Sequence, residues 1–324
     1  MGEYRYPFPP YPTGWYFVSE SAAVAPGDVV PMQWFGRDLV LFRTEGGLAA
    51  VVDAHCPHMG AHVGYGGTVE GEGIRCPFHS WHFAADGRCD DVPYATRPFV
   101  PNARLSCYPV HETSGLVLVH FDELGRPPTW WMPDRPEWGA PGWIGYETVS
   151  WRIRMHVQEL AENIPDTTHF LYVHTVPAMP DAEVEIDGHV YRQLTVGRVN
   201  GHELWRTRQE AFGLGLVWLE VDGDVTYRFL TATTPIDDEH VELRLLFLVH
   251  EGAGATELSP ASRAALQATI ENTARDVPIW EHKVYRERPV LVPGDGPIQT
   301  LRKWARQFYI DDGEPSVGVD TTAS

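Results

Sequence analysis

The sequence has few basic residues and no long apolar run. Lys and Arg total 25 against 44 Asp and Glu, and the net charge of −19 would repel a phosphate backbone. No apolar stretch approaches the roughly 18–20 residues that span a bilayer, and the first residues lack the apolar segment of a signal peptide. We therefore expect a cytoplasmic protein with no membrane span and no nucleic-acid partner.

Cysteine is also scarce. The four cysteines are too few for a disulfide scaffold in 324 residues, which fits a reducing compartment. Cys89 and Cys107 have no neighbours that resemble metal ligands, and we expect both to be small buried hydrophobic residues. No Gly-x-Gly-x-x-Gly motif opens a helix after a strand, so a nicotinamide cofactor would have to act through another polypeptide.

Two regions with different patterns make up the chain, and 43% of its residues are hydrophobic, enough for a large core. Short β-rich runs broken by Gly, Pro and Asp predict a small all-β domain in residues 1–125. The proline-rich stretch 126–136 predicts a connection. A helical segment at 158–168, five strand-like runs between 190 and 249, and helices at 260–285 and 299–309 follow. We therefore predict a second, α+β domain in residues 126–324, an antiparallel sheet with helices against it.

Two short loops in the first region each combine a cysteine with a histidine. They read Cys56-Pro57-His58 and Cys76-Pro77-Phe78-His79, with residues 59–75 between them. A Rieske centre holds one iron by two cysteines and the other by two histidines, which raises its reduction potential. Because each loop offers one ligand to each iron, Cys56, His58, Cys76 and His79 predict a 2Fe–2S cluster.

A structural zinc site is the alternative, since two cysteines and two histidines also bind zinc. Zinc fingers usually group cysteine with cysteine and histidine with histidine, whereas the types alternate here. Six glycines between positions 60 and 73 fit backbone that turns tightly around a cluster. The pattern favours the iron–sulfur cluster, and we expect the neighbouring His55, His62 and His82 to be mainly structural.

The second region contains the spacing Asp166-x-x-His169-x-x-x-x-His174. Two imidazoles and one carboxylate form the facial triad that binds non-haem Fe(II) and leaves positions open for O₂. On a helix, Asp166 and His169 would share a face, so the carboxylate would orient the imidazole. His169 and His174 would lie about 140° apart on an ideal helix, so we predict that the helix ends or widens between them. Spacing alone leaves the third ligand open among Asp166, Glu159, Glu162 and later acidic residues.

Both constellations resemble motifs of one enzyme family. Residues 53–61 and 76–83 resemble the Rieske motif of ring-hydroxylating and related oxygenases, and Ala61 and Phe78 stand where respiratory Rieske proteins carry an extra cysteine. Residues 159–174 resemble the mononuclear iron motif of the same oxygenases. Segments 9–15, 92–95 and 295–309 resemble the branch that contains the 3-ketosteroid 9α-hydroxylase oxygenase component and cholesterol 7-desaturase.

The resemblance implies a set of site residues. His169, His174 and Asp276 would bind the mononuclear iron, and Asp166 and Asn163 would be the catalytic residues beside it. In the family, the aspartate at the position of Asp166 links the iron site to a cluster histidine of a neighbouring subunit, which implies a ring-shaped homotrimer. Asp166 as a direct iron ligand is the alternative.

The resemblance also implies an activity. The chain would be the terminal oxygenase component that hydroxylates a hydrophobic, steroid- or terpenoid-like substrate, using O₂ and electrons from a separate NAD(P)H-dependent reductase, with or without a ferredoxin. Residues 212–219 and 227–230 are candidates for the wall of its pocket, although packing in the core is the more common role for each of these residues. Desaturation or another oxidation at the same iron is the nearest alternative. A Rieske electron-transfer protein without oxygenase activity is the alternative of a different class.

Overall fold

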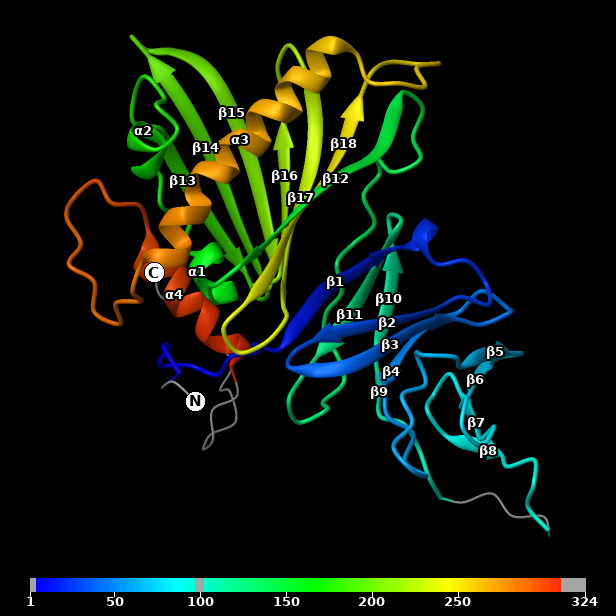
Figure 1. Cartoon of the computed structure of the whole chain (residues 1–324). Coiled ribbons are helices and arrows are strands. Elements are labelled where there is room, and N and C mark those ends of the chain that lie inside the picture. Colours follow the sequence, from blue (N-terminus) through cyan, green and yellow to red (C-terminus); the bar gives the residue numbers. More distant parts are fainter. Residues whose placement is uncertain (1–3, 97–101, 310–324) are drawn as a thin grey trace.

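The computed structural model describes residues 4–96 and 102–309, whose path is drawn in Figure 1. Three small antiparallel sheets form the first region, with strand orders β1-β11-β10, β2-β3-β4-β9 and β5-β6-β7-β8. The strands are β1 (Gly14–Glu20), β2 (Val29–Trp34), β3 (Arg37–Arg43), β4 (Ala49–Asp53), β5 (Thr68–Glu70), β6 (Gly73–Arg75), β7 (His82–Ala84), β8 (Cys89–Asp91), β9 (Cys107–Tyr108), β10 (Val110–Thr113) and β11 (Leu116–Phe121).

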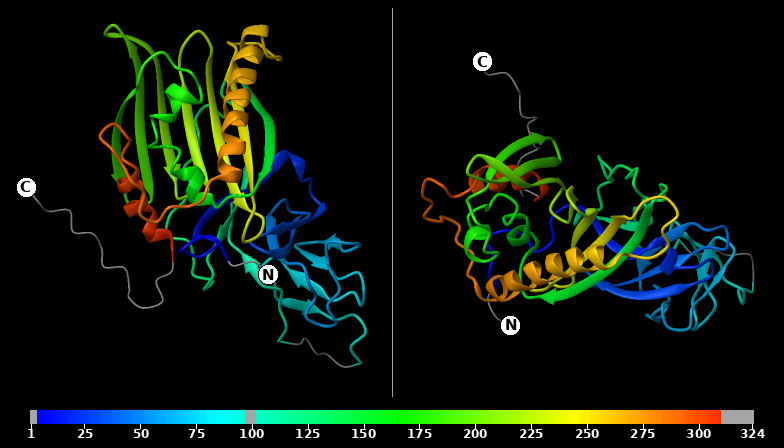
Figure 2. Two further views of the ribbon diagram at one scale, coloured as in Figure 1. Left: turned by 60° about the vertical axis from the view of Figure 1, so that its left-hand side comes forward. Right: turned by 90° about the horizontal axis from the view of Figure 1, so that it is seen from above.

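One large sheet dominates the second region. Its seven strands are antiparallel in the order β12-β18-β17-β16-β15-β14-β13. They are β12 (Trp143–Ile153), β13 (Asp181–Asp187), β14 (Val190–Val199), β15 (His202–Phe212), β16 (Leu216–Val221), β17 (Thr226–Pro235) and β18 (Val241–His250). The α-helices are α1 (Val157–Ala161), α2 (His169–Tyr172), α3 (Pro260–His282) and α4 (Ile298–Ala305). Figures 1 and 2 show α3 along one face of the sheet, with α1 and α2 on the same side.

Local sequence explains most of these elements. Turn residues bound the strand-like runs, and the predicted strand at 190–199 coincides with β14. Ser259 caps α3 by accepting a hydrogen bond from the Ser262 N–H, as an N-terminal serine is expected to do. The sequence reading missed β12 and β13, and the helix predicted at 158–168 is wrong in extent, because α1 ends at Ala161.

The two regions share two hydrophobic core clusters. Alternate residues of β1 face opposite sides, so Tyr16 packs in a core cluster with Phe121 and Leu243, while Trp15 packs in another. The Thr234 hydroxyl donates to the Phe17 carbonyl oxygen at 2.7 Å, which ties β17 to β1. The first region is therefore packed against central strands of the large sheet, β16 and β17, rather than held only by residues 122–142.

The predicted fold class is confirmed: an all-β first region precedes an antiparallel sheet with a few helices. Within residues 4–96 and 102–309, no helix is long and apolar enough to cross a membrane. The division of the chain after residue 125 stays a prediction.

Candidate metal centres and active-site cavity

The two cysteine loops of the first region are built as the same turn. In each, the cysteine N–H donates to the carbonyl oxygen five residues later, from Cys56 to Ala61 at 2.8 Å and from Cys76 to Trp81 at 2.9 Å. Each cysteine carbonyl accepts from the N–H four residues later, which belongs to Gly60 or to Ser80. Both of those residues have positive φ, 76° and 56°, so each loop reverses tightly around its cysteine.

This geometry gathers the four predicted cluster ligands. Cys56 and Cys76 are each 2% exposed and are free thiols, and the rings of His58 and His79 lie 4.7 Å apart, centroid to centroid. Burial and the neighbouring Cys76 raise the pKa of Cys56 to about 11, so its thiolate needs a cation nearby. The buried His79 Nδ1 has no hydrogen-bond partner within the described residues. Two buried thiols and two adjacent imidazoles, one with an unpartnered buried nitrogen, fit a 2Fe–2S cluster.

The other residues of the first region have structural partners. His62 Nδ1 accepts from the Gly64 N–H at 3.1 Å, and His82 Nδ1 lies 2.5 Å from Asp90 Oδ1. Cys89 is buried as expected, but Cys107 is exposed on β9, so its predicted burial is wrong. The short strand β9 pairs with β4 at the sheet edge, which leaves the Cys107 side chain outside the core.

The second site starts at α2. This helix begins at His169 and ends at Tyr172, and Thr175 has φ of 55°, so the chain has left helical geometry by His174. The predicted break between His169 and His174 is confirmed, and it allows the two rings to approach within 5.0 Å, centroid to centroid. A regular helix would have pointed these rings apart.

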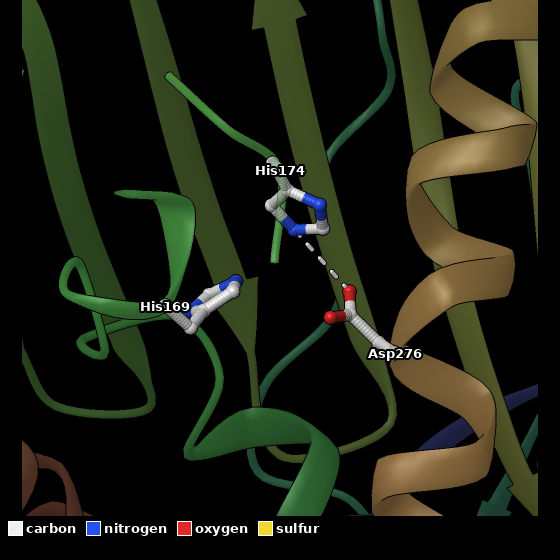
Figure 3. Close-up of side chains that lie close together, drawn as sticks. All are labelled: His169, His174 and Asp276. Carbon is white, nitrogen blue, oxygen red and sulfur yellow. Dashed lines mark ion pairs between the residues drawn. The ribbon is translucent and has the colours of Figure 1, made fainter. Parts of the chain in front are cut away.

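A third residue joins the two histidines from α3. Asp276 is 5% exposed, and one ligand atom from each of His169, His174 and Asp276 lies within 4.8 Å of the others. Figure 3 shows the three side chains converging, with His174 Nε2 at 3.4 Å from Asp276 Oδ2. The Nδ1 atoms of both histidines are buried without a partner in the described part of the chain. This donor set fits non-haem Fe(II).

The other acidic candidates are held elsewhere or lie beside the triad. Glu159 Oε2 accepts from the Tyr6 hydroxyl at 2.7 Å, and Glu162 pairs with Arg302 at 2.7 Å. Asp166 does not share a helix with His169, as the sequence reading expected, because it precedes α2. Its Oδ1 instead accepts from the His169 backbone N–H at 3.3 Å and lies 3.8 Å from His169 Nδ1.

Two polar neighbours approach the His169 ring from different sides. Asn163 Nδ2 lies 3.4 Å from His169 Nε2, and Asp166 lies on the Nδ1 side. Burial alone would raise the pKa of Asp166, but the nearby His169 outweighs that effect, and the net pKa is lowered. The structure thus brings together Asp166, His169 and His174, the residues of the predicted spacing, and places Asp276 beside the two histidines.

A cavity of about 430 Å³ opens beside the triad, between the sheet and α3, and both His174 and Asp276 line it. Most of its walls are aliphatic or aromatic, and none of the described residues that line it is Lys or Arg. The predicted lining segments are half right, since strand alternation turns Val217, Leu219 and Phe229 toward the cavity and Trp218 away from it. The sequence reading missed the lining residues Trp205, Thr207, Gln209, Asn272 and Trp280. For β15, the alternation of Arg206, Arg208 and Glu210 with less polar residues was the available signal.

Comparisons with known proteins agree with this arrangement. Residues 14–109 match the Rieske 2Fe–2S domain, and residues 119–309 match the 3-ketosteroid 9α-hydroxylase C-terminal domain. The 3-ketosteroid-9α-monooxygenase oxygenase component of Mycolicibacterium smegmatis is 30% identical, over 97% of this chain and 88% of the relative. The cholesterol 7-desaturase of Bombyx mori is 33% identical, over 93% of this chain and 70% of the relative.

Solved structures show the same fold. Dicamba monooxygenase bound to dicamba superposes with a TM-score of 0.70 at 16% identity, over 91% of this chain and 96% of that one. NdmA of Pseudomonas putida with caffeine gives 0.70 at 18% identity, over 90% and 89%. The chain belongs to the Rieske oxygenases with a 3-ketosteroid 9α-hydroxylase C-terminal domain, and it is an oxygenase component.

Proposed function

We propose that the protein oxidises a C–H bond of a neutral, hydrophobic, steroid- or terpenoid-like molecule. It would use O₂ and electrons that a separate NAD(P)H-dependent reductase, with or without a ferredoxin, delivers to the 2Fe–2S cluster. The convergence of His169, His174 and Asp276 at the wall of an apolar cavity carries this proposal. A protein that only carries electrons needs neither a second metal site nor an apolar cavity beside it.

The triad residues would hold one Fe(II). Two neutral imidazoles and one carboxylate on one side of the metal leave other positions open, and the bound iron supplies O₂ activation. Asp276 contributes the negative charge from a rigid helix, and its burial among apolar side chains strengthens its attraction for a cation. Asp166 as a direct ligand is less well supported, because its carboxylate is engaged with the His169 backbone.

Asp166 and Asn163 would position the His169 imidazole rather than bind iron. The Asp166 carboxylate on the Nδ1 side would favour a proton on Nδ1 and leave Nε2, the nitrogen beside Asn163, for the iron. The Asp166 side chain is 38% exposed, so it is accessible to another protein surface. By family resemblance, that surface would be the cluster region of a second copy, in a homotrimer, with electrons passing between subunits.

The cavity supports a neutral substrate. Its volume lies within the roughly 300–1,000 Å³ of small-molecule pockets, and a carboxylate substrate would find no cationic side chain in the lining. The names of the relatives point to sterols and ketosteroids. Because one of these relatives is named a desaturase, desaturation by the same site is the second candidate reaction.

The first test is the metal content of anaerobically purified protein. We expect three irons and two acid-labile sulfides per chain, with a red-brown chromophore bleached by dithionite. The Asp276→Asn variant should keep the chromophore and lose one iron. Two irons in the wild type after incubation with excess Fe(II) would favour a carrier, and zinc without colour would contradict both readings.

The reaction itself can be tested without the partner reductase. Protein reduced with dithionite is mixed with androst-4-ene-3,17-dione or cholesterol and then with O₂. The molecular masses of the products are measured by mass spectrometry. Gain of one oxygen atom would indicate hydroxylation, and loss of two hydrogens desaturation. If iron-replete protein forms neither product, the steroid proposal is rejected.

A further inference from the structure

Gln209 is a buried amide on the cavity wall whose polar atoms have no protein partner. It is 7% exposed, it lines the cavity, and its side chain makes no hydrogen bond with any residue the structure describes. The side chain is buried as a whole, but its amide atoms are not among the enclosed atoms that lack a partner, so they face the space of the cavity, where a ligand can hydrogen-bond to them. Gln209 is therefore unlike the cavity's other buried polar groups.

The polar side chains on or against α3 bond to the protein itself, whereas the half-buried Thr207 and Thr231 on the sheet make no side-chain hydrogen bond with the described residues. The Tyr227 hydroxyl and Thr269 Oγ1 are 2.9 Å apart, and the Thr273 hydroxyl donates to the Thr269 carbonyl oxygen at 3.1 Å. Asn272 Oδ1 accepts from Arg275 at 3.4 Å. The α3 side of the cavity is thus largely satisfied without a ligand.

The neighbour of Gln209 in the sheet provides an internal comparison. Gln193 on β14 is paired with Gln209 in register and is more deeply buried. Its Nε2 donates to the Ile164 carbonyl oxygen at 2.7 Å and to Thr195, while its Oε1 is enclosed without a partner among the described residues. Gln193 therefore supports the linker between α1 and α2, close to the triad. Gln209 lies one strand further into the cavity, and its side chain makes no hydrogen bond to another described segment.

On its other side, Gln209 adjoins an apolar surface. Leu219 on β16 pairs with Gln209 and Phe229 on β17 pairs with Leu219, so the three side chains form one row across three strands. Leu219 and Phe229 line the cavity, with Trp205 and Trp280 among the remaining walls. A flat apolar molecule lying on this row would bring one end against the Gln209 amide.

We propose that Gln209 determines specificity by hydrogen-bonding a ketone or hydroxyl oxygen of a rigid polycyclic substrate that lies on Leu219 and Phe229. This inference rests on the proposed function. The amide can donate to a ketone or accept from a hydroxyl, so it recognises oxygen of either kind. Because the row is fixed in the sheet, the hydrogen bond sets which carbon of the substrate faces His169, His174 and Asp276.

The test compares binding of three steroids that share one carbon skeleton. They are 5α-androstan-3-one, 5α-androstan-17-one and the hydrocarbon 5α-androstane, each titrated into the anaerobic holoenzyme. Trp205 and Trp280 line the cavity, so quenching of tryptophan fluorescence reports binding without turnover. Gln209→Leu should weaken one ketone by about 2- to 13-fold, the equivalent of a net hydrogen bond. The same variant should bind the hydrocarbon at least as well as the wild type does.

The control variant is Thr231→Val, which removes a hydroxyl from another position of the cavity wall with little change of shape. It should leave the discrimination between ketone and hydrocarbon unchanged. An alcohol in place of the ketone at the preferred position should also be bound more weakly by Gln209→Leu than by the wild type, because the amide can hydrogen-bond to oxygen of either kind.

Three results would overturn the inference: equal weakening of ketone and hydrocarbon in Gln209→Leu, loss of discrimination only in Thr231→Val, or failure of the wild type to bind either ketone. The proposed function fails separately, on metal content and O₂ chemistry. Ketone binding that depends on Gln209 in a protein without mononuclear iron would keep the inference and reject the oxygenase reading.

Discussion

The two candidate metal centres are assembled from the chain in opposite ways. The cluster ligands come from two nearby loops with the same hydrogen bonds, beside strands β5 to β8 of only three residues each. The triad joins the segment of α2 to the 23-residue helix α3, and both lie on the same face of a seven-stranded sheet. Strands of three residues contribute few core side chains, mainly Ile74 and Phe83, so the cluster should help to hold its own surroundings together. The triad, by contrast, should be shaped by the protein before metal binds.

The strongest test of this contrast removes one cluster ligand. Cys76→Ser should abolish the red-brown chromophore and both sulfides, and the β5 to β8 sheet should lose its protection from amide hydrogen exchange, because metal binding there is coupled to folding. The iron bound by the triad should remain. Cys107→Ser is the matched control, since Cys107 is exposed and should change neither property. A protected β5 to β8 sheet in the cluster-free variant would contradict the contrast.

The second test breaks a tertiary contact on which the triad region depends. Arg302 on α4 pairs with Glu162 just after α1, and their side chains are 12% and 9% exposed. Arg302→Met leaves a buried carboxylate without its cation, so the free energy of unfolding should fall by about 3–5 kcal/mol. In the first region, Glu70→Gln removes an exposed partner of Arg75, and the loss of stability should be far smaller because solvent screens this pair. Urea denaturation followed by circular dichroism measures both, and equal losses would refute the difference.

The same contrast explains what the sequence could predict. The cysteine loops are local, so residue types and spacing were enough to identify all four ligands. Helical geometry predicted the break between His169 and His174, because two rings five residues apart cannot otherwise meet. Spacing could not select Asp276, since only the packing of α3 against the sheet brings it to the histidines. Only the family resemblance singled it out.

Other features depended on tertiary structure in the same way. β12 is an edge strand with mixed exposure, and its pairing with β18 stabilises it more than any local signal does. The helical reading of Asp166 was wrong because the chain leaves α1 at Ala161 and passes Pro165 before α2 begins. The alternation in β15 marks Gln209 as facing inward, but which face of the sheet carries a cavity is decided by α3.

The third test concerns Asp166, where the two centres would meet between subunits. Asp166→Asn keeps the size and the hydrogen bond from the His169 N–H but removes the charge. We expect full iron and sulfide content, with O₂-dependent turnover lowered roughly 10- to 100-fold, the usual effect of losing a partner of a metal ligand. Rapid-mixing absorbance of the reduced cluster should show slower reoxidation. Loss of one iron from the variant would instead identify Asp166 as a ligand.

The last test asks whether acid destabilises the second region first, through a buried histidine at the start of α1. His156 caps α1, where its Nδ1 accepts from the Gln158 N–H and its Nε2 lies 3.1 Å from the Pro9 carbonyl oxygen. Complete burial lowers the pKa of His156 from 6.5 to about 3, because a second ring proton would be desolvated and would displace the cap. Between these values the unfolded chain binds a proton that the folded chain excludes, so stability falls as pH falls.

From pH 6.5 to pH 5 this histidine alone should lower the free energy of unfolding by about 2 kcal/mol. His156→Gln should be less stable at pH 7, because Gln replaces the cap poorly, but its stability should vary less over this interval. His202→Gln is the control, since His202 is exposed at the start of β15. The difference between the slopes of wild type and variant, measured by urea denaturation at several pH values, cancels the titration of the remaining groups. Identical slopes would mean that acid acts first elsewhere, and the buried region around α1 would then not be the acid-sensitive part of the molecule.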